Sequence, residues 1–199
     1  LPQHRIAKYP LPQRDRSKLL IFRNNSIIDS NFCEITKEIP EQSIIVSNNS
    51  KVIPARLFFH KESGAVIEIF CLEPHEPSDY EQSFSQIRQC TWKCIVGNLK
   101  KWKNNNLYKI ITLNDIEYKI KATKLFTNRE ETIIRFEWNG NTSFSQLLEI
   151  IGALPIPPYL ERETESSDYE KYQTVYSKID GSVAAPTAGL HFTEKVLSE

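Results

Sequence analysis

The residues best suited to chemistry lie in an uncharged segment of small side chains, from Gly181 to Thr193. Within it, His191 is the side chain that titrates near neutral pH, so it is the candidate catalytic acid or base. Thr187 and the backbone around Gly189, which has no Cβ to obstruct a close approach, are candidate contacts for a small molecule. In the alternative interpretation, His191 is buried, hydrogen-bonds the loop and takes no part in a reaction.

The sequence around this segment predicts a strand, a tight loop and the start of a helix. Residues 182–185 are expected to form a short buried strand, which ends at Pro186 because proline has no N–H to donate to a ladder. Thr193 is the expected N-cap of a helix that begins at Glu194. A loop between a strand and a helix start is a common ligand site in α/β folds, so this position suits a binding site.

The middle of the chain predicts a series of short strands with no helix between them. Apolar alternation and turn residues mark five strands, at 65–72, 92–96, 107–113, 116–120 and 132–138. This spacing is typical of a small β-barrel or sandwich. A polar, proline-containing loop that could be mobile is expected at 73–89.

Both sides of this β region carry signals of a different domain. After it, a short helix through 147–151 is expected, capped by Ser143 or Ser145. Before it, short strands are expected at 19–22, 27–28 and 43–47. We therefore predict an α/β domain of residues 1–61 and 143–199, into which an all-β domain (a small β-barrel) of residues 62–142 is inserted.

Charge is balanced in total but not along the chain. The sequence has 25 basic and 25 acidic residues, for a formal net charge of zero. Residues 88–125 nevertheless carry nine basic side chains against two acidic ones, and residues 149–199 carry four against nine. Such asymmetry suits an enzyme that contacts a phosphate backbone with one part and a small molecule with another. The alternative is an ordinary β surface with solvated lysines.

The four cysteines, Cys33, Cys71, Cys90 and Cys94, form no CxxC pair and have no histidine at ligand spacing. Reduced thiols in the cytoplasm are therefore expected, with no metal site. No apolar run is long enough to span a membrane and no signal peptide begins at Leu1, so no membrane association is expected.

Several stretches together carry a family resemblance. Residues 183–193, Val-Ala-Ala-Pro-Thr-Ala-Gly-Leu-His-Phe-Thr, resemble the signature of the S-adenosylmethionine:tRNA ribosyltransferase-isomerases of queuosine biosynthesis. In the family's order, the chain also has Tyr9-Pro-Leu-Pro-Gln-Arg-Asp15, Val52-Ile-Pro-Ala-Arg-Leu57, Leu154-Pro-Ile-Pro-Pro-Tyr159 and Tyr172-Gln-Thr-Val-Tyr176. The resemblance spans nearly all of the chain.

The sequence departs from the family pattern in two places. Where the family usually has Asn-Asp-Thr-Arg, this chain has Asn48-Asn-Ser-Lys51, so a carboxylate is replaced by an amide and an arginine by lysine. Family members also continue beyond the position that matches Glu199. We therefore expect the sequence to be the N-terminal portion of a longer chain.

The resemblance implies the reaction and its partners. The ribosyl unit of S-adenosylmethionine is transferred to 7-aminomethyl-7-deazaguanine at the tRNA wobble position and rearranged to an epoxycyclopentane to give epoxyqueuosine, with release of adenine and methionine. S-adenosylmethionine is then a co-substrate, and no permanently bound cofactor and no metal are expected. The implied protein is a cytoplasmic monomer, an α/β domain with a β-barrel insertion.

The resemblance also implies the site residues. His191 is the implied catalytic residue; the implied contacts to S-adenosylmethionine or substrate are Asn48, Lys51, Arg56, Tyr159, Arg162, Tyr172, Gln173, Pro186, Thr187, Gly189 and Phe192. The basic residues expected to contact tRNA are Lys100, Lys101, Lys103, Lys119, Lys121 and Lys124. The alternatives are that Arg56 is a surface cation and that the tyrosines line a core.

Two other functions stay open. A conventional methyltransferase would use the same co-substrate, but the six glycines form no glycine-rich strand-to-helix turn. A non-catalytic relative could bind RNA through its basic β-barrel, and the altered residues at 49–51 favour that idea. Adenine release marks the ribosyl transfer, S-adenosylhomocysteine marks the methyltransferase, and RNA binding with neither product marks the non-catalytic relative.

Overall fold

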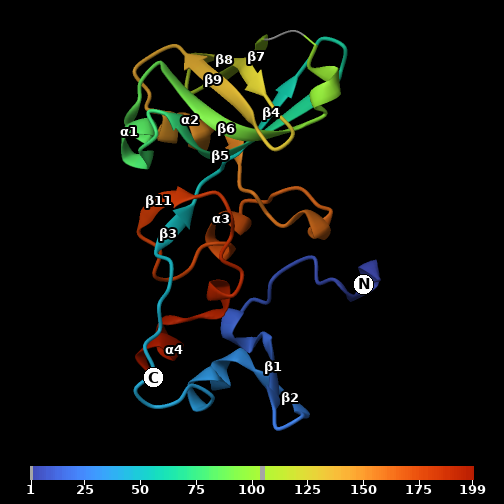
Figure 1. Ribbon diagram of the computed structural model, residues 1–199, viewed down its shortest axis with the longest axis vertical. Helices are drawn as coiled ribbons and strands as arrows, with labels where there is room; N and C mark the ends of the chain where they lie inside the picture. Colours follow the sequence, from blue (N-terminus) through green and yellow to red (C-terminus); the bar gives the residue numbers. More distant parts are fainter. Residues whose placement is uncertain (1, 104–105) are drawn as a thin grey trace. The chain divides into compact units, whose positions relative to one another are not determined.

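The computed structural model describes residues 2–103 and 106–199, and its secondary structure is mostly β (Figure 1). The chain divides into two compact units. The first comprises Leu1–Val52 and Ile156–Glu199, and the second comprises Ile53–Pro155. The α/β architecture predicted for residues 1–61 and 143–199, and the insertion of 62–142 into it, stay predictions.

The second unit is built on one seven-stranded sheet. Its strands are β4 (Arg56–His60), β5 (Val66–Glu76), β6 (Gln89–Gly97), β7 (Asn106–Leu113), β8 (Ile116–Thr127), β9 (Thr132–Trp138) and β10 (Gly152–Ala153). They lie in the order β10-β4-β5-β6-β9-β8-β7, and each neighbouring pair is antiparallel. The five strands predicted in this region are confirmed, and the sheet curls strongly (Figure 1).

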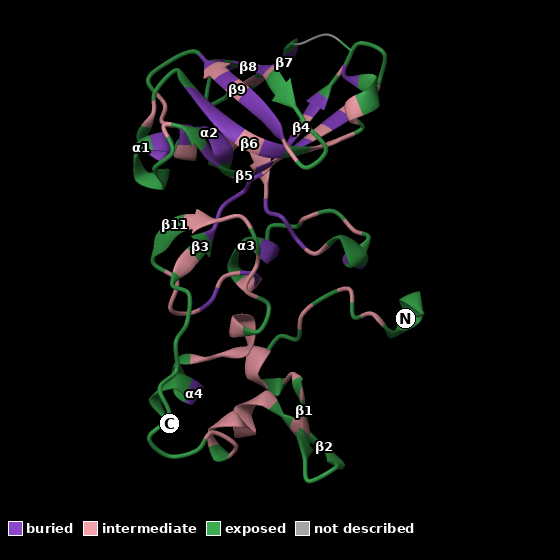
Figure 2. Ribbon diagram, viewed as in Figure 1, coloured by how far each residue is buried: buried purple, intermediate pink, exposed green. Residues whose placement is uncertain are grey.

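The core of the second unit lies on the concave face of this sheet. Alternation along β5 buries Ile67 and Ile69 completely and leaves their neighbours partly exposed, as period-2 patterning requires. Helix α2 (Phe144–Ile151) covers that core, and the Phe144 ring packs 5.4 Å from Trp92 and 5.5 Å from Phe136. Figure 2 shows the buried residues gathered in these strands and in α2.

A lysine joins two strands that do not pair in the sheet. Lys109 on β7 donates from Nζ to the Phe58 carbonyl on β4 at 3.2 Å and to the Ile151 carbonyl at 3.4 Å. Half-burial of this ammonium group lowers the pKa of Lys109. The sheet is therefore a half-barrel, which fits the predicted β-barrel in part, and a side chain rather than a backbone ladder links β7 to β4.

The first unit contains two small sheets. Strands β1 (Lys18–Arg23) and β2 (Ser26–Asn31) form an antiparallel hairpin, whose turn residues Asn24 and Asn25 have φ of 50° and 62°. Both values suit a two-residue hairpin turn, so the predicted turn is confirmed. Strands β3 (Ser50–Val52) and β11 (Ile179–Ser182) pair in parallel.

Short helices and single helical turns complete both units. In the first unit these are η1 (Gln3–Arg5), η2 (Arg14–Arg16), η3 (Phe32–Lys37), η5 (Pro158–Leu160), α3 (Asp168–Lys171), η6 (Gly189–His191) and α4 (Glu194–Ser198). In the second unit they are α1 (Tyr80–Ser85), η4 (Leu99–Lys101) and α2. The cap of α2 is Ser143, whose side chain forms a capping box with Gln146.

Three predicted elements are wrong or displaced. Residues 43–47 form no strand, and Ile44 and Val46 are each 90% exposed, because an apolar run becomes a strand only where a partner strand pairs with it. The buried strand predicted at 182–185 lies earlier in the chain, as β11 (Ile179–Ser182), where it can pair with β3, and residues 182–185 are not buried. The loop predicted at 73–89 contains the last residues of β5 and helix α1, which Asp79 caps by accepting from the Gln82 N–H at 2.9 Å.

Candidate functional site

A groove of about 660 Å³ in the first unit is the candidate functional site. Residues from three separated segments line it, within 7–18, 157–172 and 187–191. These segments hold the N-terminal motif (Tyr9–Asp15), the end of the third motif (Leu154–Tyr159) and the His191 loop. Motifs that are far apart in the sequence therefore meet at one surface, which we call the first-unit groove.

Four of the sequence-predicted site residues line the first-unit groove: Tyr159, Tyr172, Thr187 and His191. Tyr159 is 56% exposed, whereas Tyr172 is buried, and burial raises the pKa of Tyr172. Thr187 is exposed and His191 is half-buried. An exposed tyrosine, a buried one, a hydroxyl and an imidazole thus line one groove.

The His191 ring is held by packing. Its centroid lies 5.3 Å from that of Phe32 in a tilted arrangement. In the parts of the chain that the structure describes, no hydrogen bond to the imidazole is found. The alternative in which His191 hydrogen-bonds its own loop is therefore not the arrangement seen, and both ring nitrogens are available to a ligand.

The loop that carries His191 is closed by backbone hydrogen bonds. The Thr187 N–H donates to the Ala185 carbonyl at 2.9 Å, and the Gly189 N–H donates to the Pro186 carbonyl at 2.8 Å. Pro186 therefore serves the turn through its carbonyl. These bonds form a compact turn directly ahead of η6 and present Thr187 and His191 to the same groove.

The helix after this loop begins where the sequence predicted. The Thr193 hydroxyl accepts from the Val196 N–H at 3.2 Å and caps α4, so the predicted N-cap is confirmed. The same hydroxyl lies 3.4 Å from Oδ2 of Asp15. Thr193 thereby connects the N-terminal motif to the signature motif.

Packing leaves no free space for a side chain at Gly189. A Cβ at this position would lie 2.5 Å from the Tyr176 hydroxyl oxygen and 3.0 Å from Cγ2 of Thr174. Phe192, close by in the chain, packs edge-on against Phe32 with ring centroids 4.9 Å apart. Gly189 and Phe192 therefore position the loop from behind, and neither lines the first-unit groove.

Arg162 is committed to internal partners. Its two terminal nitrogens contact the Asp168 carboxylate at 2.6 and 2.8 Å, and its Nε donates to the Lys8 carbonyl at 2.8 Å. The Asp168 side chain is 1% exposed, and the hydrogen bonds from Arg162 lower the pKa of Asp168. The guanidinium also lies 4.6 Å from the centroid of the Tyr9 ring. Arg162 thus supports Tyr9 and does not line the groove.

Gln173 joins two elements of the first unit. Its side-chain oxygen accepts from the Val52 N–H at 2.8 Å, and its side-chain nitrogen donates to the Val52 carbonyl at 2.7 Å. The Gln173 carbonyl accepts from Arg14 at 2.9 Å. This amide acts as an extra rung beside β3, so its place in the structure is that of a clamp.

Three predicted residues of the second motif (residues 48–57) have other neighbours. The Asn48 side-chain oxygen accepts from both the N–H and the hydroxyl of Ser50, each at 2.7 Å. Lys51 lies exposed on β3. Arg56 lies on β4 in the second unit, with its Nε 3.0 Å from the Glu68 carboxylate.

The predicted RNA-binding lysines fall into two groups. Lys119 and Lys121 each lie 3.0 Å from a carboxylate oxygen, of Glu117 and Glu137, and Lys124 donates to the Trp102 carbonyl at 3.0 Å. The second group, Lys100, Lys101 and Lys103, lies on or just after η4. In the described residues, no carboxylate lies within ion-pair distance of its side chains.

Sequence reasoning missed the contribution of the N-terminal segment to the groove. Tyr9, Arg14 and Lys18 line it, as does Glu170 on α3. The Tyr9 hydroxyl donates to Glu165 at 2.9 Å, and this bond raises the pKa of Tyr9. The basic, proline-rich character of residues 1–18 was the available signal, but composition alone does not say which surface an extended segment lines.

Comparison of the whole sequence with known proteins identifies its family. The sequence model of the family described as queuosine biosynthesis protein matches residues 1–199. The chain belongs to this family. Three relatives named S-adenosylmethionine:tRNA ribosyltransferase-isomerase, from Trichlorobacter lovleyi, Fusobacterium nucleatum and Natranaerobius thermophilus, are each 36% identical to it.

The match covers the chain and part of each relative. The alignments include 99–100% of this chain and 52–53% of the relatives, so the chain spans about half the length of the curated relatives it matches. No solved structure matches the chain. Over the described ranges, no helix is both long and apolar enough to cross a membrane, and no cluster of three or more His, Cys, Asp or Glu side chains is placed to hold a metal ion.

Proposed function

We propose that this protein transfers the ribosyl unit of S-adenosylmethionine to 7-aminomethyl-7-deazaguanine at the wobble position of tRNA. The ribosyl unit is then rearranged to an epoxycyclopentane, which completes epoxyqueuosine, and adenine and methionine are released. Family membership over the whole chain supports the proposal, as do the printed names of its relatives. The observation that carries it is the first-unit groove, where the His191 loop meets Tyr159, Tyr172 and the N-terminal motif.

The reaction makes three demands on the groove. A base must take a proton from the ribosyl carbon beside the sulfonium, and an acid must protonate the departing adenine. The amine of the modified base must then be held against the ribosyl carbon that it attacks. His191 is the proposed acid/base group, because its imidazole lines the groove without a hydrogen bond to the described chain.

The aromatic side chains supply the proposed hold on the co-substrate. Tyr159, Tyr172 and Tyr9 line the first-unit groove, and aromatic faces suit both a flat adenine and a sulfonium cation. Thr187 adds a hydroxyl that can fix the orientation of the ligand. S-adenosylmethionine is a co-substrate in this proposal, and no step requires a metal or a bound cofactor.

The remaining predicted residues act indirectly in this proposal. Arg162, Gln173, Pro186, Gly189 and Phe192 hold the walls and turns of the groove through the contacts described above. Asn48, Lys51 and Arg56 stay proposed substrate contacts. The lysines of the basic barrel are the proposed tRNA contacts, in an α/β protein with a barrel insertion that works as a cytoplasmic monomer.

The test is to follow adenine by mass spectrometry. The full-length natural protein is mixed with S-adenosylmethionine and tRNA that carries the aminomethyl-deazaguanine, with unmodified tRNA as the matched control. Adenine that forms only with the modified tRNA establishes the transfer. S-adenosylhomocysteine instead of adenine would establish a methyltransferase.

A third outcome concerns the altered second motif. If tRNA binds and neither product forms, the protein is a non-catalytic relative, and Asn49 is the first residue to restore, as Asn49→Asp. In the structure, the Asn49 carbonyl accepts from the Lys178 and Ile179 N–H groups at 2.7 and 3.3 Å, so the backbone at this position is held independently of its side chain. The substitution is therefore expected to leave the fold intact.

A further inference from the structure

The turn between β4 and β5 of the half-barrel carries a lysine, Lys61, next to an exposed backbone segment. Lys61 begins the turn between β4 and β5: its N–H donates to the Ala65 carbonyl, and its carbonyl accepts from the Gly64 N–H, both at 2.9 Å. Gly64 has a φ of +78°, which suits glycine, and a Cβ built there would meet no atom within 4 Å. Backbone hydrogen bonds therefore close the turn, and the space beside Gly64 is open.

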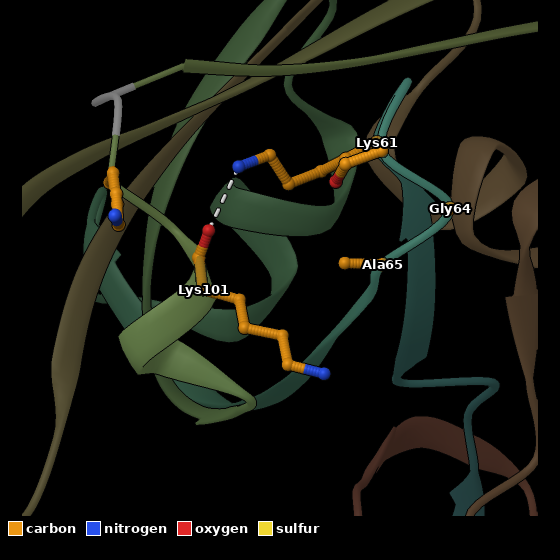
Figure 3. A pocket seen from close by; sticks show the side chains of 6 residues that line it. Lys61, Gly64, Ala65 and Lys101 are labelled. Atoms are coloured by element: carbon orange, nitrogen blue, oxygen red, sulfur yellow. Dashed lines mark hydrogen bonds between the residues drawn. The ribbon is translucent and has the colours of Figure 1, made fainter.

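Two hydrogen bonds attach a second segment to this turn. Lys61 Nζ donates to the Lys101 carbonyl at 2.8 Å, and the Asn98 side chain donates to the Val66 carbonyl at 3.0 Å. The side chain of Trp102, which follows Lys101, is only 1% exposed, so its burial in the core also anchors this segment. Figure 3 shows Lys61 reaching the Lys101 carbonyl, while the Lys101 side chain extends away from this bond. The two segments are thus held together although they lie far apart in the sequence.

Between them lies a hollow of about 590 Å³, which we call the lysine hollow. Its lining residues are Lys61, Ser63, Gly64, Ala65, Lys101 and Lys103. Three lysines and one serine are therefore among its lining residues, and no acidic residue lines it. Lys61 uses one N–H on the Lys101 carbonyl and keeps two others for a ligand.

The charge of the lysine hollow is uncompensated, unlike that of the neighbouring strands. Lys119 and Lys121 have carboxylate partners at 3.0 Å, as described above. Across the described residues, no acidic side chain lies within 4.0 Å of the ammonium groups of Lys61, Lys101 or Lys103. Positive charges without a counter-charge favour the binding of an anion.

The chemistry of the two substrates indicates which anion this is. The proposed co-substrate is a sulfonium with no phosphate, so the phosphates of the reaction belong to the RNA. We propose that the lysine hollow binds a phosphodiester of the RNA substrate, with Lys61, Lys101 and Lys103 as its contacts. This inference rests on the proposed function for the identity of the ligand, and it adds Lys61 and Ser63 to the RNA-binding surface.

The test measures RNA affinity as a function of salt. Fluorescence anisotropy with a labelled tRNA transcript gives Kd for the full-length natural protein and for the double variant Lys101→Ala/Lys103→Ala between 50 and 300 mM KCl. Each lost phosphate contact reduces the magnitude of the negative slope of log K against log salt by about 0.7 to 0.9, so two lost contacts weaken binding roughly 25- to 60-fold at 0.1 M salt. The single variant Lys61→Met is expected to lose about one contact.

A charge-matched control separates this site from a general loss of positive charge. Lys37 and Lys93 pair with Glu34 and Glu73, so the double variant Lys37→Ala/Lys93→Ala removes the same charge from compensated positions. Its Kd is expected to change less than the Kd of the hollow variant at every salt concentration. Equal losses in the two double variants would overturn the proposal, as would an unchanged salt slope in the hollow variant.

Two further measurements distinguish the phosphate source and the two proposals. Inorganic phosphate at millimolar concentration is expected not to displace the tRNA. If phosphate at that concentration displaces the tRNA, and the hollow variant binds tRNA as tightly as the wild type, then RNA is not the ligand of the lysine hollow. If the hollow variant raises KM for tRNA while kcat and KM for S-adenosylmethionine stay constant, the site serves the reaction. If no protein releases adenine but the Kd pattern holds, the proposed function fails and the phosphate site stands.

Discussion

Replacement of Gly189 by alanine should destabilise the protein, because the added Cβ would overlap the Tyr176 hydroxyl group. The added Cβ would lie 2.5 Å from the Tyr176 hydroxyl oxygen and 3.0 Å from Cγ2 of Thr174, which is 4% exposed. Real Cβ atoms essentially never approach within 3.0 Å of another heavy atom, so the Tyr176 ring or the backbone must move. Overpacking of this kind costs about 1–3 kcal/mol in the free energy of unfolding.

The same geometry predicts a rescue. Tyr176→Phe removes the hydroxyl, after which the nearest ring atom, Cζ, lies 3.6 Å from the added Cβ, an ordinary contact distance. In the described part of the chain the Tyr176 hydroxyl has no hydrogen-bond partner, so Tyr176→Phe alone should change stability by less than about 0.5 kcal/mol. The double variant should therefore recover most of the loss, with the Thr174 contact as the remaining cost.

The measurement is urea unfolding of the full-length natural protein, followed by circular dichroism for the wild type, both single variants and the double variant. Adenine release is measured in parallel, because Gly189 belongs to the same turn as His191. We expect Gly189→Ala to lower both stability and adenine release and Tyr176→Phe to restore both. A Gly189→Ala variant as stable as the wild type, or one that Tyr176→Phe leaves unrescued, would refute this packing argument.

Three further outcomes are expected. His191→Ala should reduce adenine release by about 10²- to 10⁴-fold, as for a lost general acid or base, and leave the urea midpoint unchanged; full turnover would remove His191 from the mechanism. Asp168→Ala should cost about 3–5 kcal/mol, because it leaves Arg162 without its buried partner. Since Arg162 lowers the pKa of Asp168, the wild type should lose this stabilisation as pH falls below the ordinary value of 3.8, and urea unfolding from pH 7 to 3 should show no such loss in the variant. Of the four cysteines in residues 1–199, Cys33 alone should react quickly with a thiol reagent in the native state, because the other three are buried.

Local signals predicted much of the secondary structure correctly. The hairpin turns at Asn24-Asn25 and Asn114-Asp115 have the positive φ values that such residues tolerate, and Thr193 caps its helix. The strands of the half-barrel follow the apolar alternation of the sequence. Each of these features depends on residues within a few positions of one another, so the necessary information is present in a short window.

Pairing between segments that are distant in the sequence could not be predicted from such short windows. The apolar run at 43–47 has the composition of a strand, but pairing decides strand formation, and these residues do not pair. Likewise, the chain at 182 leaves its strand where the ladder with β3 ends. No property of either segment alone contains this information.

The same distinction between local and long-range information applies to the candidate site. By itself the sequence determined the family, the loop that carries His191 and the motif residues Tyr159, Tyr172 and Thr187. Tertiary structure decided that these residues share a groove with Tyr9 and the N-terminal segment. The physical reason is that a side chain's role depends on which distant groups surround it.

The same dependence applies to the charged residues and to Gly189. Arg162 carries a charge that suits contact with an anionic ligand, yet its guanidinium is already paired with the buried Asp168 carboxylate. Gly189 suits close approach to a ligand, yet Tyr176 is the group that approaches. Among the basic residues of the half-barrel, sequence alone indicates the positive charge, whereas the fold decides which lysines meet carboxylates and which are left to bind an anion.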